Sequence, residues 1–343
     1  MKILRKILFV LIIVAGFFFY QYLPRENNSA KAPVATPESV EQASEAPAPE
    51  AEPVTFVFAG DMMFDRNVNH NYKDIGFDKI FANLDKSIFE GKDIKVANLE
   101  GPVSNKPIDD DYLSHSLVFN MPPETIPTIK NLGLNGVSLA NNHTLNAGAS
   151  GFKTTKGLLD GAGIKYAGSQ DSFDASSTMR FETEIPVSVI AVDLLSYTNV
   201  AEINKAIASE KKNGAFVIVF PHWGEEYALK HNSSQANYAM SFIDAGADLI
   251  IGGHPHVIQD VSVYKEKPII YSLGNFVFDQ YFSEDTQEGL ILSGTITKEN
   301  LTINILPFKS VKSQMKLMGT ADKQKLLDRI NGGKDTIEVS IAP

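Results

Sequence analysis

The chain has 343 residues, no cysteine and a formal net charge of −10 at pH 7. The absence of thiols excludes disulfides, thiolate metal sites and attachment through a lipoprotein cysteine, so a bound metal must have oxygen and imidazole ligands. The net charge is negative, and Lys and Arg are not clustered beyond the N-terminus. Both features disfavour electrostatic binding to nucleic acid.

The N-terminal segment is apolar and carries its positive charges at one end. Three basic residues precede an uncharged stretch, residues 7–20, which can be extended to residue 23. This length is short for a spanning helix and is shared with the apolar region of signal peptides. Because the stretch stays bulky and aromatic to its end, and no small-x-small cleavage site follows closely, we interpret residues 1–23 as a transmembrane signal anchor. Its N-terminus is then cytoplasmic, and either interpretation exports the rest of the chain.

Residues 24–53 have the composition of a linker. They contain six prolines, six glutamates, many alanines and no aromatic residue. Such a segment cannot bury enough apolar surface to fold, so it is predicted to be disordered and fairly extended. A stalk that holds a domain off the membrane and a spacer of no particular length both fit this composition.

Beyond the linker, five short apolar runs each end in side chains that can bind a divalent metal. The runs are β-branched and aromatic-rich and mostly lack polar alternation, which is typical of strands buried on both faces. They cover residues 54–60, 94–97, 136–140, 216–220 and 249–253. The side chains at their ends are Asp61, Asn98 and Glu100, Asn141 to His143, His222, and His254 with His256. Because ligands of open α/β sheets bind outside the carboxyl ends of the strands, these side chains are predicted to converge on one site.

Stretches with helical periodicity lie between these strands, and the alternation predicts an α/β fold. The predicted helices cover residues 77–92, 123–132, 150–161, 201–212 and 233–245. For the last of them, Ser233 or Ser234 is the expected N-cap and Gly246 the expected end.

After residue 286 the alternation of predicted strands and helices ends, and strand-like runs follow one another. Residues 289–297 and 301–306 are separated by a short polar turn and predict a hairpin. The later elements expected are a helix over residues 321–330 and a strand over residues 336–341. We therefore divide the chain beyond the linker into a domain over residues 54–312 and a C-terminal extension over residues 313–343.

Each of the polar side chains also has a simpler explanation when it is taken alone. Asp61 could cap a turn, Glu100 could be a solvated loop residue, and the Asn141 cluster could cap a helix. His222 could be a core histidine bonded to a backbone carbonyl. His254-Pro255-His256 is harder to explain in this way, because two imidazoles separated by one residue in an extended backbone point to the same side. The shared position at strand ends favours a metal site.

The ligand types indicate which metals and which chemistry to expect. Imidazole and carboxylate together suit Zn, Mn, Fe or Co, and one or two divalent ions are expected, with Mn, Fe or Zn the best fit. Two ions about 3.5–4 Å apart can clamp the attacking and leaving oxygens of a phosphoryl displacement. Glu100 could bridge them, and a histidine outside the ligand set could protonate the leaving group.

Six segments stand out as motifs, and together they resemble a known family. The segments are Gly60 to Arg66, Ala97 to Glu100, Leu139 to His143, Pro221 to Tyr227, Gly252 to Val257 and Tyr271 to Phe278. In this order they resemble the motif series of the CapA family, the capsule synthesis and poly-γ-glutamate biosynthesis proteins. The similarity runs from about residue 55 to 282 and is specific as a set, although no single motif would suffice.

The resemblance implies a fold, a ligand set and a catalytic residue. The CapA family is similar to the calcineurin-like metallophosphoesterases, which fold as a four-layer α/β/β/α sandwich. The implied ligands are Asp61 and His256 for one metal, and Asn142, His222 and His254 for the other. Glu100 stands where the superfamily has a bridging aspartate, and His143 is the implied catalytic acid.

One position departs from the superfamily pattern. The first motif of the superfamily is Asp-x-His, whereas this chain has Asp61-Met62-Met63. A thioether is a weak ligand for a hard site, so the first metal would lose an imidazole. The departure affects the expectation of catalysis more than that of metal binding.

Arg66 and Asn275 are the candidates for contacting an anionic substrate. Arg66 could hold a phosphate or carboxylate through two parallel hydrogen bonds, or it could form a surface ion pair. Six aromatic residues could line a pocket, although core packing explains each of them alone. They are Trp223, Tyr227, Phe276, Phe278, Tyr281 and Phe282.

The leading hypothesis is a membrane-anchored, extracytoplasmic CapA-like protein. It would act in the assembly, export or attachment of a cell-surface polymer and would use a metal-dependent hydrolytic or transfer site. Its expected partners are the polymer or its precursor and the subunits of a membrane polymer synthase. Poly-γ-glutamate is implied as the polymer by the resemblance alone. A second hypothesis is a non-catalytic synthase subunit that has kept the fold, and a third is a general exported phosphoesterase.

Overall fold

The computed structural model describes residues 51–105 and 117–341. The anchor predicted over residues 1–23 and nearly all of the predicted linker lie outside these ranges. Within them, no helix combines the length and the apolarity needed to cross a membrane. The anchor and the linker therefore stay predictions.

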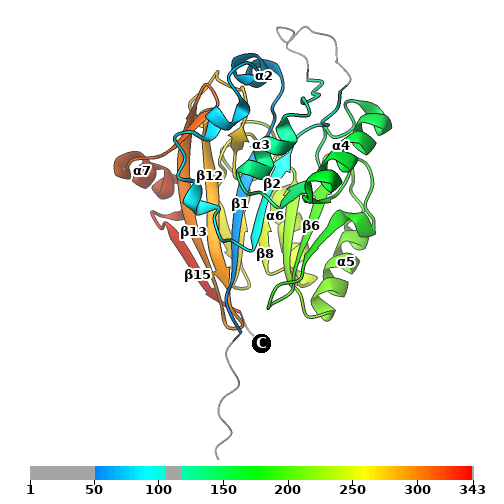
Figure 1. The fold of residues 1–343 in the computed structure, drawn as a ribbon. Helices are drawn as coiled ribbons and strands as arrows, with labels where there is room; N and C mark the ends of the chain where they lie inside the picture. Colours follow the sequence, from blue (N-terminus) through cyan, green and yellow to red (C-terminus); the bar gives the residue numbers. More distant parts are fainter. Residues whose placement is uncertain (1–50, 106–116, 342–343) are drawn as a thin grey trace, which may run out of the picture. The chain divides into compact units, whose positions relative to one another are not determined.

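The described residues form two β-sheets with helices, which confirms the predicted α/β class (Figure 1). The larger sheet has the strand order β14-β13-β12-β1-β2-β3-β4, with β11 also paired to β1 and β15 to β13. Its strands are β1 (Val54–Met62), β2 (Ile94–Leu99), β3 (Gly136–Ser138), β4 (Lys165–Ala167), β11 (Asn275–Val277), β12 (Glu288–Ile296), β13 (Asn300–Val311), β14 (Gln314–Leu317) and β15 (Thr336–Ser340). The smaller sheet has the order β5-β6-β7-β8-β10-β9. Its strands are β5 (Thr178–Phe181), β6 (Val187–Asp193), β7 (Phe216–His222), β8 (Leu249–Ile251), β9 (Val261–Tyr264) and β10 (Lys267–Ile270).

The five runs predicted to be buried strands are all strands, but they divide between the two sheets. β1, β2 and β3 are adjacent parallel strands of the larger sheet, while β7 and β8 are adjacent parallel strands of the smaller one. β6 is a further strand of the same kind; it runs parallel to β7, ends at Asp193 and is absent from the predicted set. The carboxyl ends that carry polar residues therefore belong to both sheets.

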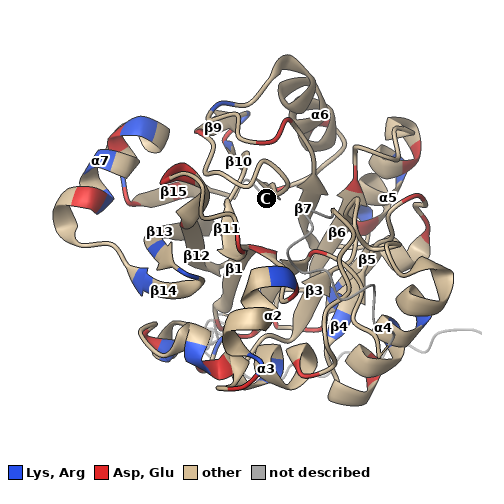
Figure 2. Ribbon diagram, turned by 90° about the horizontal axis from the view of Figure 1, so that it is seen from above, with Lys and Arg blue, Asp and Glu red and all other residues tan. Residues whose placement is uncertain are grey.

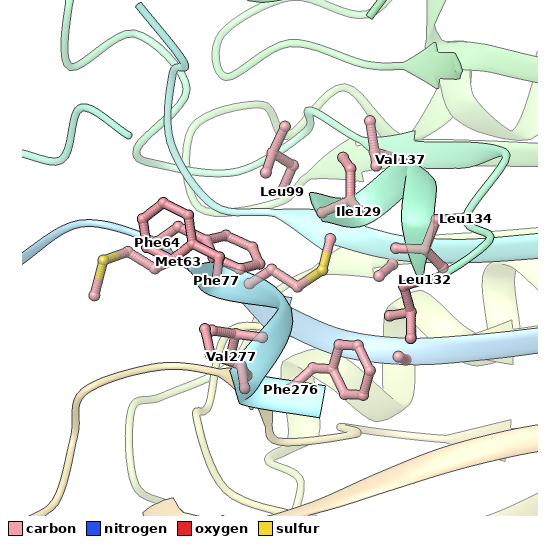
Figure 3. Close-up of a cluster of buried hydrophobic side chains, with 14 of the residues drawn as sticks. Met63, Phe64, Phe77, Leu99, Ile129, Leu132, Leu134, Val137, Phe276 and Val277 are labelled. Atoms are coloured by element: carbon pink, nitrogen blue, oxygen red, sulfur yellow. The ribbon is translucent and has the colours of Figure 1, made fainter. Parts of the chain in front are cut away.

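Three apolar clusters show how the sheets and helices pack. One fills the space between the sheets, where Phe58 of β1 meets Phe220 of β7 with ring centroids 5.7 Å apart. A second lies between the larger sheet and α2 (Arg66–Tyr72), α3 (Thr125–Asn131) and α4 (Gly148–Ala162), and is drawn in Figure 3. A third joins the smaller sheet to α5 (Val200–Lys212) and α6 (Ser233–Asp244). Burial of both sheet faces explains why the strands lack polar alternation.

The helix predicted over residues 77–92 is wrong. The chain forms two short 3₁₀ helices there, η1 (Phe77–Phe81) and η2 (Lys86–Ile88). Asp85 has an extended backbone, and its side chain accepts a hydrogen bond from the Ser87 N–H (N···O 3.0 Å), so it starts a new turn instead of continuing a helix. The apolar side chains that suggested the helix still enter the core.

The other helices predicted between strands are confirmed as α3, α4, α5 and α6. The N-cap of α6 differs from the prediction, because it is Asn232 and not Ser233 or Ser234. The Asn232 side chain accepts from the Gln235 N–H, and the Gln235 side chain accepts from the Asn232 N–H, both at 3.0 Å. This reciprocal capping box satisfies two N–H groups and defines the start of the helix.

The segment beyond residue 312 joins the larger sheet. The predicted hairpin is formed by β12 and β13, and both β14 and β15 pair with β13. The predicted helix is α7 (Thr320–Asn331), and the final strand is β15. Acidic and basic residues are interspersed along α7, as the view in Figure 2 shows. The division of the chain at residue 312 stays a prediction.

Candidate metal centre

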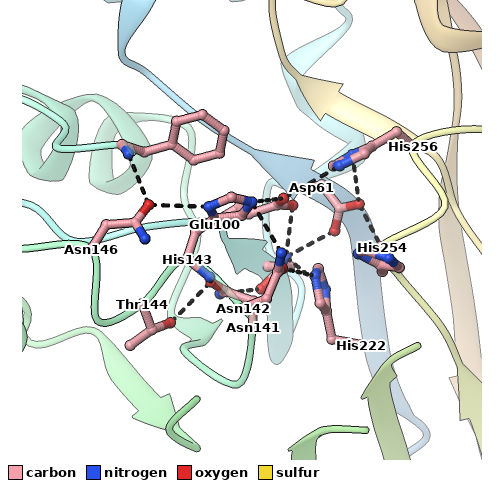
Figure 4. A network of polar contacts seen from close by, with 12 residues as sticks. Asp61, Glu100, Asn141, Asn142, His143, Thr144, Asn146, His222, His254 and His256 are labelled. Atoms are coloured by element: carbon pink, nitrogen blue, oxygen red, sulfur yellow. Dashed lines mark hydrogen bonds and ion pairs between the residues drawn. The ribbon is translucent and has the colours of Figure 1, made fainter. Parts of the chain in front are cut away.

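Five strand ends bring polar side chains together at one edge of the two sheets. The larger sheet contributes Asp61 in β1, Glu100 after β2, and Asn142 and His143 after β3; the smaller contributes His222 at the end of β7, and His254 and His256 after β8. All of them except Asn142 are buried. Figure 4 shows these side chains turned toward one another from separate strands. The structure thus brings together every residue predicted as a ligand or as the catalytic acid.

Asp61 is positioned by a close backbone approach. A Cβ atom added at Gly60 would lie 1.9 Å from the carbonyl oxygen of Gly274, so only glycine allows β1 to come this near. The Asp61 N–H donates to the same oxygen (N···O 3.1 Å). Its carboxylate accepts hydrogen bonds from Asn98 Nδ2 at 2.8 Å and from the His254 backbone N–H at 3.1 Å. Burial nevertheless raises the pKa of Asp61 to about 6.

Glu100 is fully buried and weakly hydrogen-bonded. Its Oε2 accepts from Asn98 Nδ2 at 3.3 Å, whereas Oε1 has no hydrogen-bond partner among the described residues. Oε1 lies 3.5 Å from His256 Nε2 and 3.9 Å from His143 Nε2. Burial, and then the negative charge of Asp61, raise the pKa of Glu100 well above its ordinary value. A cation close to both carboxylates would favour their ionised forms.

His254 and His256 enter the site through an unusual backbone conformation. Their φ angles are 95° and 58°, so the extended backbone predicted for this segment is wrong. The left-handed turn at His254 allows its N–H to reach the Asp61 carboxylate, a bond that offsets part of the strain. His256 Nδ1 lies 2.9 Å from the side-chain oxygen of Asn275, while His254 Nδ1 is buried without a hydrogen-bond partner in the described part of the chain.

His222 and Asn142 meet across the two sheets. His222 Nε2 lies 2.9 Å from Asn142 Oδ1, a separation that two ligands of one ion can adopt. The ring of His222 is also next to that of His254, with centroids 4.8 Å apart. Burial lowers the pKa of His222 well below its ordinary value and that of His254 to about 4. Both imidazoles are therefore neutral at pH 7 and keep a lone pair for a metal.

His143 is held in one tautomer by its neighbours. Its Nδ1 lies 3.0 Å from Asn146 Oδ1, and the same oxygen accepts a hydrogen bond from the Phe119 N–H at 2.8 Å. Because that oxygen is an acceptor, we assign the proton of neutral His143 to Nδ1. Its Nε2 then accepts from Asn142 Nδ2 at 3.1 Å. Burial lowers the pKa of His143, and its ring packs against that of Phe119 with centroids 4.2 Å apart.

Met63 belongs to the apolar core. It is fully buried in the cluster on the outer face of the larger sheet, where Figure 3 shows it beside Phe64. Its sulfur lies 3.0 Å from the backbone nitrogen of Asp65, which donates to it. The side chain that departs from the superfamily pattern is therefore used in packing.

Arg66 and Asn275, the predicted substrate contacts, both have partners within the protein. Arg66 is paired with Asp279, and its side chain is 16% exposed. Asn275 accepts from His256 Nδ1 and donates through Nδ2 to two carbonyl oxygens at 3.0 Å. Asn275 thus orients a candidate ligand. Contact of either residue with substrate stays a prediction.

The aromatic residues expected around a pocket fall into two groups. The first is buried or half-buried and consists of Trp223, Phe276, Phe278 and Tyr281. The second is Tyr227 and Phe282, which are 43% and 68% exposed. Their rings meet edge to face with centroids 5.2 Å apart, and the Tyr227 ring lies 6.3 Å from that of His256. The exposed Tyr227 ring therefore lies beside a candidate ligand, and Phe282 packs against Tyr227.

Asn98 and Asp193 are buried residues of the site that are not among the ligands implied by the resemblance. Asn98 sits in a motif, and its amide bonds to both buried carboxylates. Asp193 ends β6 opposite His222, its Oδ2 is buried without a partner among the described residues, and burial raises its pKa to about 6. The sequence does contain a signal for Asp193, because the apolar run over residues 187–192 ends in an acid as the run of β1 does.

The donor set fits a divalent cation. Within the described ranges, the Asp, Glu and His side chains form two groups of three whose ligand atoms lie within 4.8 Å of one another: Asp61, Glu100 and His256, and Glu226, His254 and His256. Glu100 Oε1 and His254 Nδ1 are buried without partners there, although buried polar atoms are normally paired. Carboxylate and imidazole ligands without thiolate suit Mn, Fe or Zn. The sequence alone did not single out Glu226.

Comparison with known proteins agrees with this geometry. Residues 55–280 match the family described as Bacterial capsule synthesis protein PGA_cap. The chain belongs to this family. The family is part of the metallophosphoesterase-like superfamily, and all the candidate ligands and His143 lie within the matched residues.

Relatives with assigned names share much of the chain. The capsule biosynthesis protein CapA of Bacillus anthracis is 29% identical over 324 residues, which cover 86% of this chain and 77% of that protein. The PGA biosynthesis protein CapA of Bacillus subtilis (strain 168) is 30% identical over 254 residues, covering 68% and 66%. A probable polyglutamine synthesis accessory protein of Mycobacterium tuberculosis (strain ATCC 25618 / H37Rv) is 26% identical over 215 residues, covering 54% and 56%.

Proposed function

We propose that this protein acts in the biosynthesis or export of a cell-surface polymer of the poly-γ-glutamate type, through a metal-dependent site that cleaves or transfers a phosphoester. The observation that carries the proposal is the convergence of Asp61, Glu100 and three neutral imidazoles at the strand ends of two facing sheets. Membership of a capsule synthesis family supports the biological role. The three apolar clusters support the four-layer sandwich of metallophosphoesterases as the architecture.

The ligands divide between the two sheets. Asp61, Glu100 and His256 would hold one cation, and Asn142, His222 and His254 would hold a second. A bound divalent cation supplies Lewis-acid activation of a phosphoryl oxygen and a more acidic water. The buried carboxylates and neutral imidazoles keep this chemistry in a region that excludes bulk water, where electrostatic interactions are strong.

His143 would donate the proton that the leaving oxygen needs. Asn146 holds Nδ1–H, so Nε2 is the atom that can exchange a proton inside the site. Burial lowers the pKa of His143, and an entering anionic phosphoester would raise it again, because an opposite charge favours the imidazolium. The guanidinium carbon of Arg66 lies 4.8 Å from the ring centroid of Phe119, which itself packs against His143, and Arg66 would hold the anion as it enters.

The test uses the full-length chain purified in mild detergent. Metal content is measured by elemental analysis, and turnover is measured with bis(p-nitrophenyl) phosphate. We expect bound Mn, Fe or Zn, and turnover that stops with a chelator and returns with the metal. His143→Ala should keep its metal and lose turnover by about 10²–10⁴-fold, the usual contribution of a general acid. Full activity in this variant would overturn the catalytic assignment.

A non-catalytic role in a polymer synthase is the second candidate. It is favoured by the mycobacterial relative, which is named an accessory protein, and by Met63, which packs in the core. In that case the chain would copurify with membrane synthase subunits, and Glu100→Ala would leave polymer output unchanged. A loss of polymer with Glu100→Ala, in a protein that still folds, would exclude it.

We also propose that residues 1–23 anchor the protein in the cell membrane with the site outside the cytoplasm. The support is the sequence of this segment, in which basic residues precede a bulky apolar run. Protease added to intact spheroplasts should then digest the domain, and deletion of residues 1–23 should leave the protein in the cytosol. Protection from the protease in intact spheroplasts would contradict the proposed orientation.

A further inference from the structure

Glu226 lies beside two of the candidate ligands. Its carboxylate and the imidazoles of His254 and His256 have ligand atoms that all lie within 4.8 Å of one another. Both imidazoles are buried, whereas Glu226 is exposed. The three residues therefore span from the buried part of the centre to its solvent side.

The backbone holds Glu226 in this position. The Tyr227 N–H donates to the Pro255 carbonyl at 2.8 Å, between the two histidines, and the Trp223 N–H donates to the Gly253 carbonyl at 3.1 Å. The loop after β7 is thus tied to the segment after β8 on both sides of Glu226. The φ of Tyr227 is 65°, a conformation that non-glycine residues adopt mainly where surrounding contacts impose it.

Two observations indicate that a cation is needed beside this carboxylate. His254 is 6% exposed, and its Nδ1 has no hydrogen-bond partner among the described residues. A buried ring nitrogen normally has a hydrogen-bond partner, so the unpaired Nδ1 of His254 is a candidate for binding a cation. His256, the other imidazole beside Glu226, has its Nε2 3.5 Å from Glu100 Oε1, an oxygen that also lacks a hydrogen-bond partner among the described residues.

We propose that Glu226 is a further carboxylate ligand of this metal centre, placed beside His254 and His256, which the proposed function assigns to different cations. The inference rests on the proposed metal-dependent function. His256 also belongs to the group of Asp61 and Glu100, so Glu226 extends the same centre toward solvent. A carboxylate at the exposed side supplies negative charge to the centre from a position that substrate can reach.

The experiment compares two neighbouring glutamates in the full-length chain. Glu226→Gln removes the carboxylate of the group, and Glu225→Gln removes the same charge from an adjacent exposed residue that is in neither group. After chelation, each protein is titrated with Mn²⁺, and free Mn²⁺ is followed by electron paramagnetic resonance. We expect Glu226→Gln to bind Mn²⁺ at least about tenfold more weakly than wild type, and Glu225→Gln to bind within about twofold of it.

The other outcomes separate this inference from the proposed function. Equal affinity of wild type and Glu226→Gln would overturn the assignment of Glu226 and leave the metal centre intact. Equal weakening in both variants would also overturn it, because the effect would then be a long-range charge effect. A wild-type chain that binds no Mn²⁺, Fe²⁺ or Zn²⁺ would overturn the proposed function itself. Thermal unfolding of the metal-free variants checks that each remains folded.

Discussion

His222 Nε2 lies 2.9 Å from the side-chain oxygen of Asn142, although the two residues are 80 positions apart and sit on different sheets. His222 ends β7 of the smaller sheet, and Asn142 comes after β3 of the larger one. Their contact closes the edge at which the two sheets meet. Loss of the His222 side chain should therefore weaken metal binding.

His222→Ala should weaken Mn²⁺ binding by about 10–100-fold or more, because it removes a neutral imidazole from the ligand set. Affinity can be measured by competition with a fluorescent chelator. His231→Ala is the matched control, since His231 is paired with Asp260 at 2.9 Å and is not one of the candidate ligands. If His222→Ala bound Mn²⁺ as tightly as wild type, His222 would be a core histidine and not a ligand.

Asn146→Ala should reduce turnover and change its pH dependence while leaving metal content intact. The variant removes the oxygen that accepts from His143 Nδ1, so the imidazole can adopt the other tautomer and lose its orientation. We expect a fall of roughly tenfold in kcat and a shifted pH profile, and partial rescue in Asn146→Asp, which keeps an acceptor oxygen. An unchanged profile in Asn146→Ala would show that this contact has no part in proton transfer.

Metal affinity should rise between pH 5 and pH 7. Burial raises the pKa of Asp61 to about 6, so this carboxyl holds a proton at pH 5 that the metal must displace, and it is ionised at pH 7. The histidines do not oppose the trend, because the pKa of His254 is lowered to about 4 and its lone pair is free over the whole range.

The proton of Asp61 alone, with a pKa near 6, corresponds to roughly a tenfold change in affinity over these two pH values. The pKa of Glu100 is raised as well, so displacement of its proton acts in the same direction. Titrations with Mn²⁺ at pH 5, 6 and 7 would measure it. Asp61→Asn should show a flatter dependence, because it has no proton to lose. A wild-type affinity that stays constant over this range would contradict the assignment of Asp61 as a ligand.

Gly60→Ala should destabilise the fold and disturb the centre. Its Cβ would lie 1.9 Å from the Gly274 oxygen, so the backbone of β1 must shift. Overpacking of this kind costs about 1–3 kcal/mol, which urea unfolding can measure. Gly157→Ala is the control, since a Cβ there meets nothing within 4 Å and the residue lies in α4. That change should be neutral or stabilising by up to about 1 kcal/mol.

The local pattern of the chain was sufficient to predict five buried strands and the polar side chains that converge at their ends. A strand buried on both faces has a continuous apolar run, and the polar residue that ends it is visible without any knowledge of tertiary contacts. Asp61, His222 and His254 were predictable in this way. The same rule applied to residues 187–192 would have added Asp193.

Other features depend on contacts that are distant along the chain. Residues 77–92 have a helical apolar period, yet the side chain of Asp85 competes for the backbone and divides them into two 3₁₀ helices. The left-handed backbone at His254 is explained only by the Asp61 carboxylate that its N–H reaches, 193 positions away. No local propensity could predict that conformation, because the partner that offsets its strain comes from another strand.

By itself, the sequence determined the α/β class, the capsule synthesis family and a set of candidate oxygen and imidazole ligands at strand ends. The tertiary structure decided that these ends belong to two facing sheets, that Met63 packs in the core, and that Glu226 approaches His254 and His256. The physical reason is that the burial of a strand or helix is visible in the order of polar and apolar side chains within that segment. The distance between two loops, in contrast, depends on how whole sheets pack together.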